Sequence, residues 1–397
     1  MPTPGWRVEC TRRSRNWTSF SSPWARAWDG HEVVATFDDK TEAVVRARGN
    51  LCHGEGHLRI DQSQDRYVRP PVFFAWSRAL SSLHMKPWVR NILLSLCALL
   101  VMAGAAYYWF IVESHVPGGA EFALDIGEVR RLAGAAPGDK PIAIEVEAVA
   151  LFKPPAAFVV AGDGWKPTDL PVYSYRVVYP QSSVIIDTAL NEELGSGNLA
   201  SFDAAAFARM QAAMAQASLI LLTHEHADHI GGLTTHPNLA AVLAATRLTR
   251  EQIANPTAML PARFPDHALD GYVPLDYRKY DAVAPGMVLI KSPGHTPGSQ
   301  MVYVQTADGK EFLFLGDVAW HFRNIEVQRE RPRFVTQFTI KEDRAAVFGQ
   351  LGALHRLHEA EPRIQIVPGH DGVAVERLID ARLMRPRFGS TASDQRN

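Results

Sequence analysis

"SLILLTHEHADHIGGL", residues 218–233, places four side chains of metal-binding type directly after a short apolar run. The run "SLILL" predicts a short buried strand, and His224, His226, Asp228 and His229 follow it. Burying three imidazoles and a carboxylate without partners would cost several kcal/mol, and a divalent metal removes that cost. His224 and His226 can point the same way from an extended segment, whereas Asp228 and His229 begin the next turn. The stretch therefore predicts ligands for two adjacent metal ions.

Three later strand ends carry further side chains of the same type. "LIKSPGHTPGS" brings His295 into a turn rich in Pro and Gly, "EFLFLGDVAW" brings Asp317, and "IQIVPGHDG" brings His370. A single His or Asp after a strand is most often a capping or surface group. Here, however, three such residues follow the first stretch in order. Together with its four candidate ligands they make a set of seven. The three cysteines all lie within the first 100 residues, so any metal here is held by nitrogen and oxygen donors.

These motifs, "THEHADHIGG", "SPGHTPGS", "GDVAW" and "VPGHD", with "IIDTAL" upstream, resemble the five ordered motifs of the metallo-β-lactamase-fold hydrolases. The resemblance covers about residues 142–375. It implies an α/β protein, an αββα sandwich with metal ions at one edge, between two sheets. The residue patterns themselves predict strands at 142–152 and 182–190 and helices at 201–217 and 344–360. Interleaved strands and helices favour a mixed α/β class.

The resemblance assigns a role to each member of the set. It implies three ligands of a first metal ion: His224, His226 and His295. It implies three ligands of a second metal ion: Asp228, His229 and His370. Asp317 would bridge both ions, and Asp187 in "IIDTAL" would support the ligands from behind and fix their orientation.

The same resemblance implies a mechanism. Two divalent ions that share a water lower its pKa, and the resulting bridging hydroxide attacks a carbonyl carbon. Asp228 is the expected catalytic residue, because it can orient this hydroxide and later carry a proton. Zn²⁺ is the expected cofactor, with two ions per chain and with Mn²⁺ or Fe²⁺ as alternatives.

The expected substrate is a small molecule with a carboxylic ester-type bond, a lactone or a thioester. A bridging Asp is typical of the lactonase, glyoxalase II and phosphodiesterase branches, and "SPGHTPGS" is most similar to the acyl-homoserine lactone lactonases. Those enzymes commonly carry a Tyr three residues after the bridging Asp. This chain has Trp320 there, which has no phenolic hydroxyl. Trp320 and His321 are the candidate substrate contacts, although a supporting or surface role is the simpler interpretation of His321.

Other functions stay open at this point. A non-haem iron redox enzyme shares the scaffold, but the flavodiiron branch usually has Glu at the position of His226. A single-iron enzyme would leave His229 and His370 without a function. Hydrolysis of a β-lactam or a phosphodiester is a further alternative. A non-catalytic membrane-tethered metal-binding protein would have no need of a complete open bimetal site.

An apolar segment precedes the motif region. Residues 91–112 carry no charge and match the roughly 20 residues that cross a bilayer as a helix. Lys86 and Arg90 flank its N-terminal side, and no Lys or Arg follows until Arg130. This distribution predicts a cytoplasmic N-terminus and an extracytoplasmic catalytic domain, periplasmic in a bacterium. Cleavage as a signal peptide, followed by secretion, is the alternative.

The chain is expected to divide into five parts. Residues 1–84 are interpreted as a disordered extension or a mis-assigned translation start, and residues 85–113 as a membrane anchor or signal segment. Residues 114–141 are a predicted linker with one short helix. Residues 142–380 form the hydrolase domain, and residues 381–397 a flexible tail.

The composition limits the partners. The chain has 397 residues, 41 Lys and Arg against 42 Asp and Glu, and a net charge of -1. Nucleic-acid binding needs a concentrated basic face, which this balance does not favour. The sequence therefore predicts no nucleic-acid partner, and it leaves the oligomeric state open.

Overall fold

The computed structural model describes six stretches of the chain: residues 25–28, 32–36, 42–46, 86–115, 121–195 and 197–390. The chain divides into two units, residues 1–100 and 101–397. In the first unit, three strands form an antiparallel sheet in the order β1 (Ala25–Trp28), β2 (Glu32–Thr36) and β3 (Glu42–Arg46). These strands lie inside the region interpreted as an extension or a mis-assigned start, and that interpretation stays a prediction.

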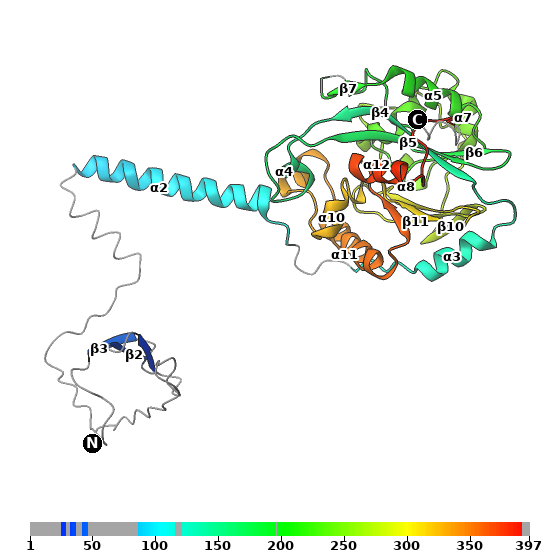
Figure 1. Cartoon of the computed structure of the whole chain (residues 1–397). Helices are drawn as coiled ribbons and strands as arrows, with labels where there is room; N and C mark the ends of the chain where they lie inside the picture. The colour runs from blue at the N-terminus through cyan, green and yellow to red at the C-terminus, as the bar shows by residue number, and fades with distance from the viewer. Residues whose placement is uncertain are drawn as a thin grey trace, which may run out of the picture. The chain divides into compact units, whose positions relative to one another are not determined.

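Two sheets form the centre of the second unit (Figure 1). The six-stranded sheet has the order β7 (Ser201–Phe202), β4 (Ala143–Phe152), β5 (Leu170–Val178), β6 (Ser183–Ile186), β8 (Leu219–Leu221) and β9 (Thr246–Arg247). The five-stranded sheet has the order β10 (Tyr280–Ala284), β11 (Met287–Lys291), β12 (Gln300–Gln305), β13 (Glu311–Phe314) and β14 (Ile364–Val367).

The two sheets pack face to face through one apolar cluster. Strand alternation decides which side chains enter it: Val184 and Ile186 of β6 point into this cluster, whereas Ile185 points to the opposite face. The inner cluster also contains Tyr175 of β5 and Phe314 of β13, whose ring centroids are 4.7 Å apart. Both faces of β6 and β13 are buried, which explains why each of these strands has a single polar residue, at its first position.

Helices cover the outer face of each sheet (Figure 1). The outer face of the six-stranded sheet packs against α5 (Ala204–Met214), α6 (Ala227–Thr234) and α7 (Leu239–Ala245). The outer face of the five-stranded sheet packs against α3 (Ile126–Ala135) and α11 (Arg344–Ala360). The layers thus run α, β, β, α, and the predicted mixed α/β class is confirmed.

Shorter helices connect these layers. They are α4 (Ala156–Val159), α8 (Arg250–Ala254), α9 (Pro256–Met259), α10 (Phe322–Glu326) and α12 (Gly372–Asp380). A 3₁₀ turn covers Gly316–Val318 and a π-helical turn covers Val335–Thr339. The apolar helix α2 (Pro87–Tyr107) continues as a π-helical turn over Tyr108–Val112. Its 26 residues are long and apolar enough to cross a membrane, and its use as an anchor stays a prediction.

Three segments differ from the sequence-based expectation. The predicted strand over 182–190 ends at Ile186, because the chain turns sharply at Asp187, whose φ is 58°. The predicted linker over 114–141 contributes α3 to the outer layer, with Val129 and Ala133 in the core.

The third difference concerns the C-terminal segment. Residues 381–390 belong to the folded domain rather than to a flexible tail. The backbone N–H of Arg385 donates to the Ile144 carbonyl at 2.8 Å, and that of Phe388 donates to Glu147 at 2.9 Å. These bonds hold the segment beside β4. Residues 391–397 lie outside the described part of the chain.

Candidate metal centre

The seven predicted ligands come from four segments of the chain, and all four lie at one edge of the sandwich. The segment that joins β8 to α6 carries four of them: His224 and His226 in its loop, and Asp228 and His229 in the first turn of α6. The other three follow strands β11, β13 and β14 in turn: His295, Asp317 and His370. Strands β13 and β14 run parallel, so their carboxyl ends bring Asp317 and His370 to the same edge. The structure thus brings together every residue that the sequence proposed as a ligand.

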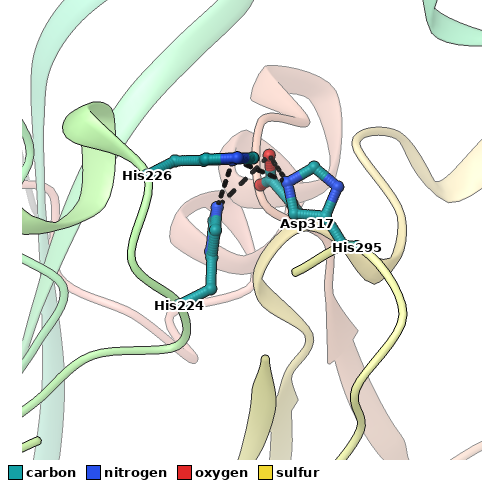
Figure 2. Close-up of side chains that lie close together, drawn as sticks. All are labelled: His224, His226, His295 and Asp317. Carbon is teal, nitrogen blue, oxygen red and sulfur yellow. Dashed lines mark hydrogen bonds and ion pairs between the residues drawn. The ribbon is translucent and has the colours of Figure 1, made fainter. Parts of the chain in front are cut away.

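The first cluster consists of three imidazoles and one carboxylate (Figure 2). His226 Nδ1 lies 3.1 Å from His224 Nε2 and 2.9 Å from His295 Nε2. The Oδ2 atom of Asp317 lies 3.3 Å from His295 Nε2 and 3.8 Å from His224 Nε2. Two nitrogens bound to one tetrahedral Zn²⁺ at about 2.0–2.1 Å would be separated by about 3.3 Å, close to these values.

The second cluster lies on the other side of the same carboxylate. His370 Nε2 is 3.5 Å from Asp228 Oδ2, and His229 Nε2 is 3.9 Å from that atom. Asp317 meets this cluster with its other oxygen, Oδ1, which lies 3.1 Å from His370 Nε2 and 3.3 Å from His229 Nε2. One carboxylate therefore presents one oxygen to each of the two clusters.

The residues fit a pair of divalent ions. His229 Nε2 and Asp317 Oδ1 are both buried, and neither makes a hydrogen bond to a described residue. Leaving a buried polar atom unpaired costs about 1–3 kcal/mol. A cation placed between these donors would satisfy both atoms at once. The donor set of imidazole nitrogens and carboxylate oxygens is suited to Zn²⁺ and also accepts Mn²⁺ or Fe²⁺.

The first cluster holds two histidines in the form that binds metals. Burial, together with the neighbouring His229, holds the pKa of His224 well below its usual range. Burial and the facing His295 lower the pKa of His226 to about 3. Both rings are therefore neutral near pH 7, with a free nitrogen lone pair directed at the centre of the cluster.

The carboxylates have the opposite effect on the other imidazoles. Burial opposes the charge on Asp317, but the surrounding imidazoles, led by His370, hold its pKa well below the usual range. Burial likewise lowers the pKa of His229, His295 and His370, and facing carboxylates overcome that effect, so all three values are raised. Metal ions would compete with these protons, so we expect metal affinity to fall as the pH falls.

Asp187 supports this centre from behind, where the resemblance had placed it. Its carboxylate accepts hydrogen bonds from the Thr223 backbone N–H at 2.6 Å and from the Thr223 hydroxyl at 2.8 Å. It also lies 2.8 Å from His229 Nδ1. The left-handed φ of 58° is unusual for a residue other than Gly and aims the carboxylate at these partners.

Two glycines allow the loops that carry Asp317 and His370 to approach neighbouring parts of the centre closely. Gly316, next to Asp317, has a φ of 53°, and a Cβ there would collide with the Thr223 side chain. A Cβ at Gly369, next to His370, would collide with Asp317 Oδ1. Both positions therefore require the absence of a side chain.

Sequence reasoning missed a second group of supporting residues. His295 Nδ1 lies 2.9 Å from Glu342 Oε2, and the same oxygen accepts Arg331 Nε at 3.0 Å. Burial opposes the charge on Glu342, but Arg331 and His295 hold its pKa below the usual range. Neither residue follows a strand or belongs to a recognisable motif, so the sequence carried no signal for them.

Glu225 was visible in the first motif but had no predicted role. Its carboxylate accepts hydrogen bonds from Thr296 Oγ1 at 2.6 Å and from Asn255 Nδ2 at 2.9 Å. Because Thr296 adjoins His295, this bond links the loop that carries His224 to the loop that carries His295. Glu225 is fully buried.

The two candidate substrate contacts behave differently. Trp320 Nε1 donates a hydrogen bond to Asp317 Oδ2 at 2.6 Å, so Trp320 contacts the centre through the carboxylate that faces both clusters. Its ring lies under the Arg331 guanidinium, whose Cζ is 4.8 Å from the ring centroid. His321 Nε2 instead lies 3.1 Å from the Asp169 backbone oxygen. The half-buried His321 imidazole is thus engaged with the backbone rather than with a candidate ligand.

Replacing Asp187 with Ala is expected to weaken binding of the second metal ion by roughly 10–100-fold, because His229 loses the partner that orients it. Metal affinity measured by competition with a chromophoric chelator tests this. Asp203→Ala is the matched control. It removes the cap of α5, at a cost of about 1 kcal/mol in stability, and should leave metal affinity unchanged. Equal affinity in both variants would contradict the role of Asp187.

Comparison with known proteins gives the family. A sequence model of the metallo-beta-lactamase superfamily matches residues 167–370, just over half of the 397 residues. No curated protein matches the chain. Among solved structures, an N-acyl homoserine lactone hydrolase with N-hexanoyl-L-homoserine at its catalytic metal centre is 17% identical, with a TM-score of 0.47. The alignment covers 60% of this chain and 96% of that chain.

A probable metal-dependent hydrolase from Staphylococcus aureus is 13% identical, with a TM-score of 0.46, over 59% of this chain and 91% of that chain. Values this low do not bear on the substrate. The family match and the ordered motifs at one edge of the sandwich lead to the same conclusion: the chain belongs to the metallo-beta-lactamase superfamily.

Proposed function

We propose that this chain is a dinuclear metal-dependent hydrolase of a carboxylic ester-type bond, with a lactone or a thioester as its substrate. The observation that carries the proposal is the placement of Asp317. Its two carboxylate oxygens face two separate sets of ligands, within 3.3 Å of His295 on one side and 3.1 Å of His370 on the other. A buried carboxylate so placed is suited to bridging two ions.

The first ion would be held by His224, His226 and His295, and the second by Asp228, His229 and His370. Two divalent ions, Zn²⁺ in the simplest case, would supply Lewis acidity toward a carbonyl and a nucleophile at neutral pH. The remaining steps depend on side chains of this chain.

Asp228 is the proposed proton carrier. Its side chain is 25% exposed, whereas the side chains of His229 and His370 beside it are 4% and 3% exposed. Asp228 therefore lies at the open side of the centre, where a substrate must arrive. A carboxylate there can take the proton of the attacking water and return it to the leaving alkoxide or thiolate.

Trp320 is the proposed orienting residue for the bridging carboxylate. The hydrogen bond from its indole nitrogen holds Asp317 Oδ2 in place. The indole has one donor and no acceptor, so Trp320 cannot exchange a proton with the substrate. Proton transfer to the leaving group is therefore assigned to Asp228.

The position in the cell is a separate proposal. We propose that α2 with its π-helical extension, Pro87–Val112, anchors the chain in a membrane and that the catalytic domain lies on the extracytoplasmic side. Support comes from the 26-residue apolar length and from the positive charges at Lys86 and Arg90 on the N-terminal side.

The full chain, purified in lipid nanodiscs, tests the hydrolase proposal. We expect about two metal ions per chain by elemental analysis. In a panel of lactones, thioesters, β-lactams and phosphodiesters, lactones or thioesters should turn over fastest. A chelator should abolish turnover, and added Zn²⁺ should restore it. A single iron per chain, or turnover that survives chelation, would contradict the proposal.

A further inference from the structure

The end of the apolar helix α2 is joined directly to the catalytic domain. The Ile111 carbonyl accepts the backbone N–H of Gly162 at 3.0 Å, and the Val112 carbonyl accepts a hydrogen bond from Arg329. Ser114 Oγ donates to Glu330 at 2.9 Å. Ile111 and Ser114 are both buried. Within the described residues 101–115, the chain at Ile111–Ser114 is therefore bonded directly to the domain.

Aromatic side chains gather around this junction. Three come from the end of the helix and three from surface segments of the domain, and together they are called the aromatic collar here: Tyr107, Tyr108, Trp109, Trp165, Phe334 and Phe338. Trp165 Nε1 donates to the Tyr107 hydroxyl at 3.2 Å. Phe338 packs against Phe110 of the helix with ring centroids 5.8 Å apart. The collar is thus continuous from the helix onto the domain.

The collar is exposed despite its apolar character. Trp165 is 53% exposed, Phe334 is 43% exposed and Phe338 is 64% exposed. Contiguous exposed aromatic surface is uncommon on a soluble domain and marks a contact surface. Tyr and Trp are the residues that favour the boundary between lipid headgroups and acyl chains.

An ion pair lies at the junction, between Arg333 and Glu113. Arg333 Nε donates to Glu113 at 2.8 Å, and its guanidinium lies over the Trp109 ring, with Cζ 4.0 Å from the centroid. An ion pair that also stacks on an aromatic ring can lie at the headgroup level without an unpaired charge.

We infer that the catalytic domain itself rests on the lipid surface, with the aromatic collar inserted at the headgroup–acyl boundary. The inference goes beyond the proposed hydrolase function and rests on the proposed anchor. The partner is a lipid bilayer because the collar is continuous with a helix whose length and composition suit the bilayer. The domain is hydrogen-bonded to Ile111 and Val112 at the end of this helix. The collar would therefore lie at the depth where the helix leaves the membrane.

The collar and the metal centre share one segment of chain. Arg331 lies between Glu342 and the Trp320 ring, and Phe334 of the collar follows three residues later. Trp320 also packs against Val159 of α4, and the neighbouring Phe158 stacks on Phe334 with centroids 5.8 Å apart. The docked surface therefore lies one layer of side chains from the residues that support the metal ligands. Substrates that partition into the bilayer would reach this side of the domain first.

Site-specific labelling of the full chain in phosphatidylcholine nanodiscs tests the inference. In a background with all three cysteines replaced by Ser, Phe338→Cys and Trp165→Cys each carry an environment-sensitive fluorophore. Val273→Cys and Val373→Cys are matched controls, because these apolar side chains are 83% and 58% exposed and lie outside the collar. A separate variant reports on the anchor. In it Cys10 and Cys52 are replaced by Ser, and the native Cys97, which is exposed in α2, carries the fluorophore.

The expected result is severalfold stronger quenching by spin-labelled lipid at the two collar positions than at the two controls, with the opposite order for aqueous iodide. Lipid quenching at Cys97 but not at the collar would overturn docking and leave the anchor in place. Protection from iodide without lipid quenching would mean that protein, such as a second copy of the chain, covers the collar, and would also overturn it. Absence of lipid quenching at Cys97 would overturn anchor and docking together.

None of these readouts depends on hydrolysis. Docking can therefore fail while the hydrolase proposal stands, and loss of hydrolysis would leave the docking result unaffected.

Discussion

Replacing Asp317 with Ala is expected to empty both metal positions and to lower kcat/KM by roughly three orders of magnitude or more. This loss exceeds the roughly 10–100-fold expected when a residue that only supports a ligand is removed. The reason is that Asp317 is shared. Its Oδ2 faces His224 and His295, and its Oδ1 faces His229 and His370. Removing it leaves two imidazole clusters with no anionic donor between them.

Elemental analysis and initial rates on the same preparation test this prediction. His226→Ala should lose both the metal of the first cluster and hydrolysis. The reason is that His226 Nδ1 lies within hydrogen-bond distance of the ring nitrogens of His224 and His295. His267→Ala is the matched control, because among the described residues this exposed imidazole forms an ion pair with Asp270 alone. Full turnover in both Asp317→Ala and His226→Ala would refute the ligand assignment.

Replacing Glu342 with Gln is expected to lower the free energy of unfolding by about 3–5 kcal/mol. Glu342 and Arg331 are an ion pair whose side chains are 0% and 1% exposed. Removing the carboxylate charge leaves the Arg331 guanidinium buried without a counter-charge. The same change weakens the support of His295, whose Nδ1 lies 2.9 Å from Glu342, so affinity for the first metal ion should also fall.

Urea unfolding of the metal-free chain isolates the stability effect from metal binding. Asp308→Asn is the matched control, since its ion pair with Lys310 is exposed and should contribute no more than about 1 kcal/mol. The double variant Arg331→Met/Glu342→Leu should recover much of the lost stability, because it buries no unpaired charge. A change below about 1 kcal/mol for Glu342→Gln would show that Arg331 finds another partner.

The seven candidate ligands were predictable because each has a local signal. His295, Asp317 and His370 each follow an apolar strand and sit in a turn with Gly, and the structure places all three beside the first motif. Strands β11, β13 and β14 run in the same direction, so their carboxyl ends lie at one edge of the sheet. The supporting role of Asp187, at the end of β6, was implied only by the resemblance to the family motifs.

The supporting residues had no such signal. Arg331 and Glu342 reach His295 from the segment between α10 and α11, a region of irregular turns in which side-chain direction follows from packing alone. His321 adjoins Trp320 in the sequence, and its imidazole lies 3.1 Å from the Asp169 backbone oxygen, in keeping with the supporting or surface role that was its simpler interpretation. Adjacent residues outside a regular element point in directions that the sequence does not encode locally.

By itself, the sequence determined the class of fold, the family motifs and the seven side chains that converge, because all of these depend on short-range patterns of polarity and turn residues. Only the tertiary structure decided that Glu342 and Arg331 support His295 and that the helix end at Val112 is bonded to the domain. These features join residues distant in the chain, and their geometry is set by how two sheets and their covering helices pack against each other.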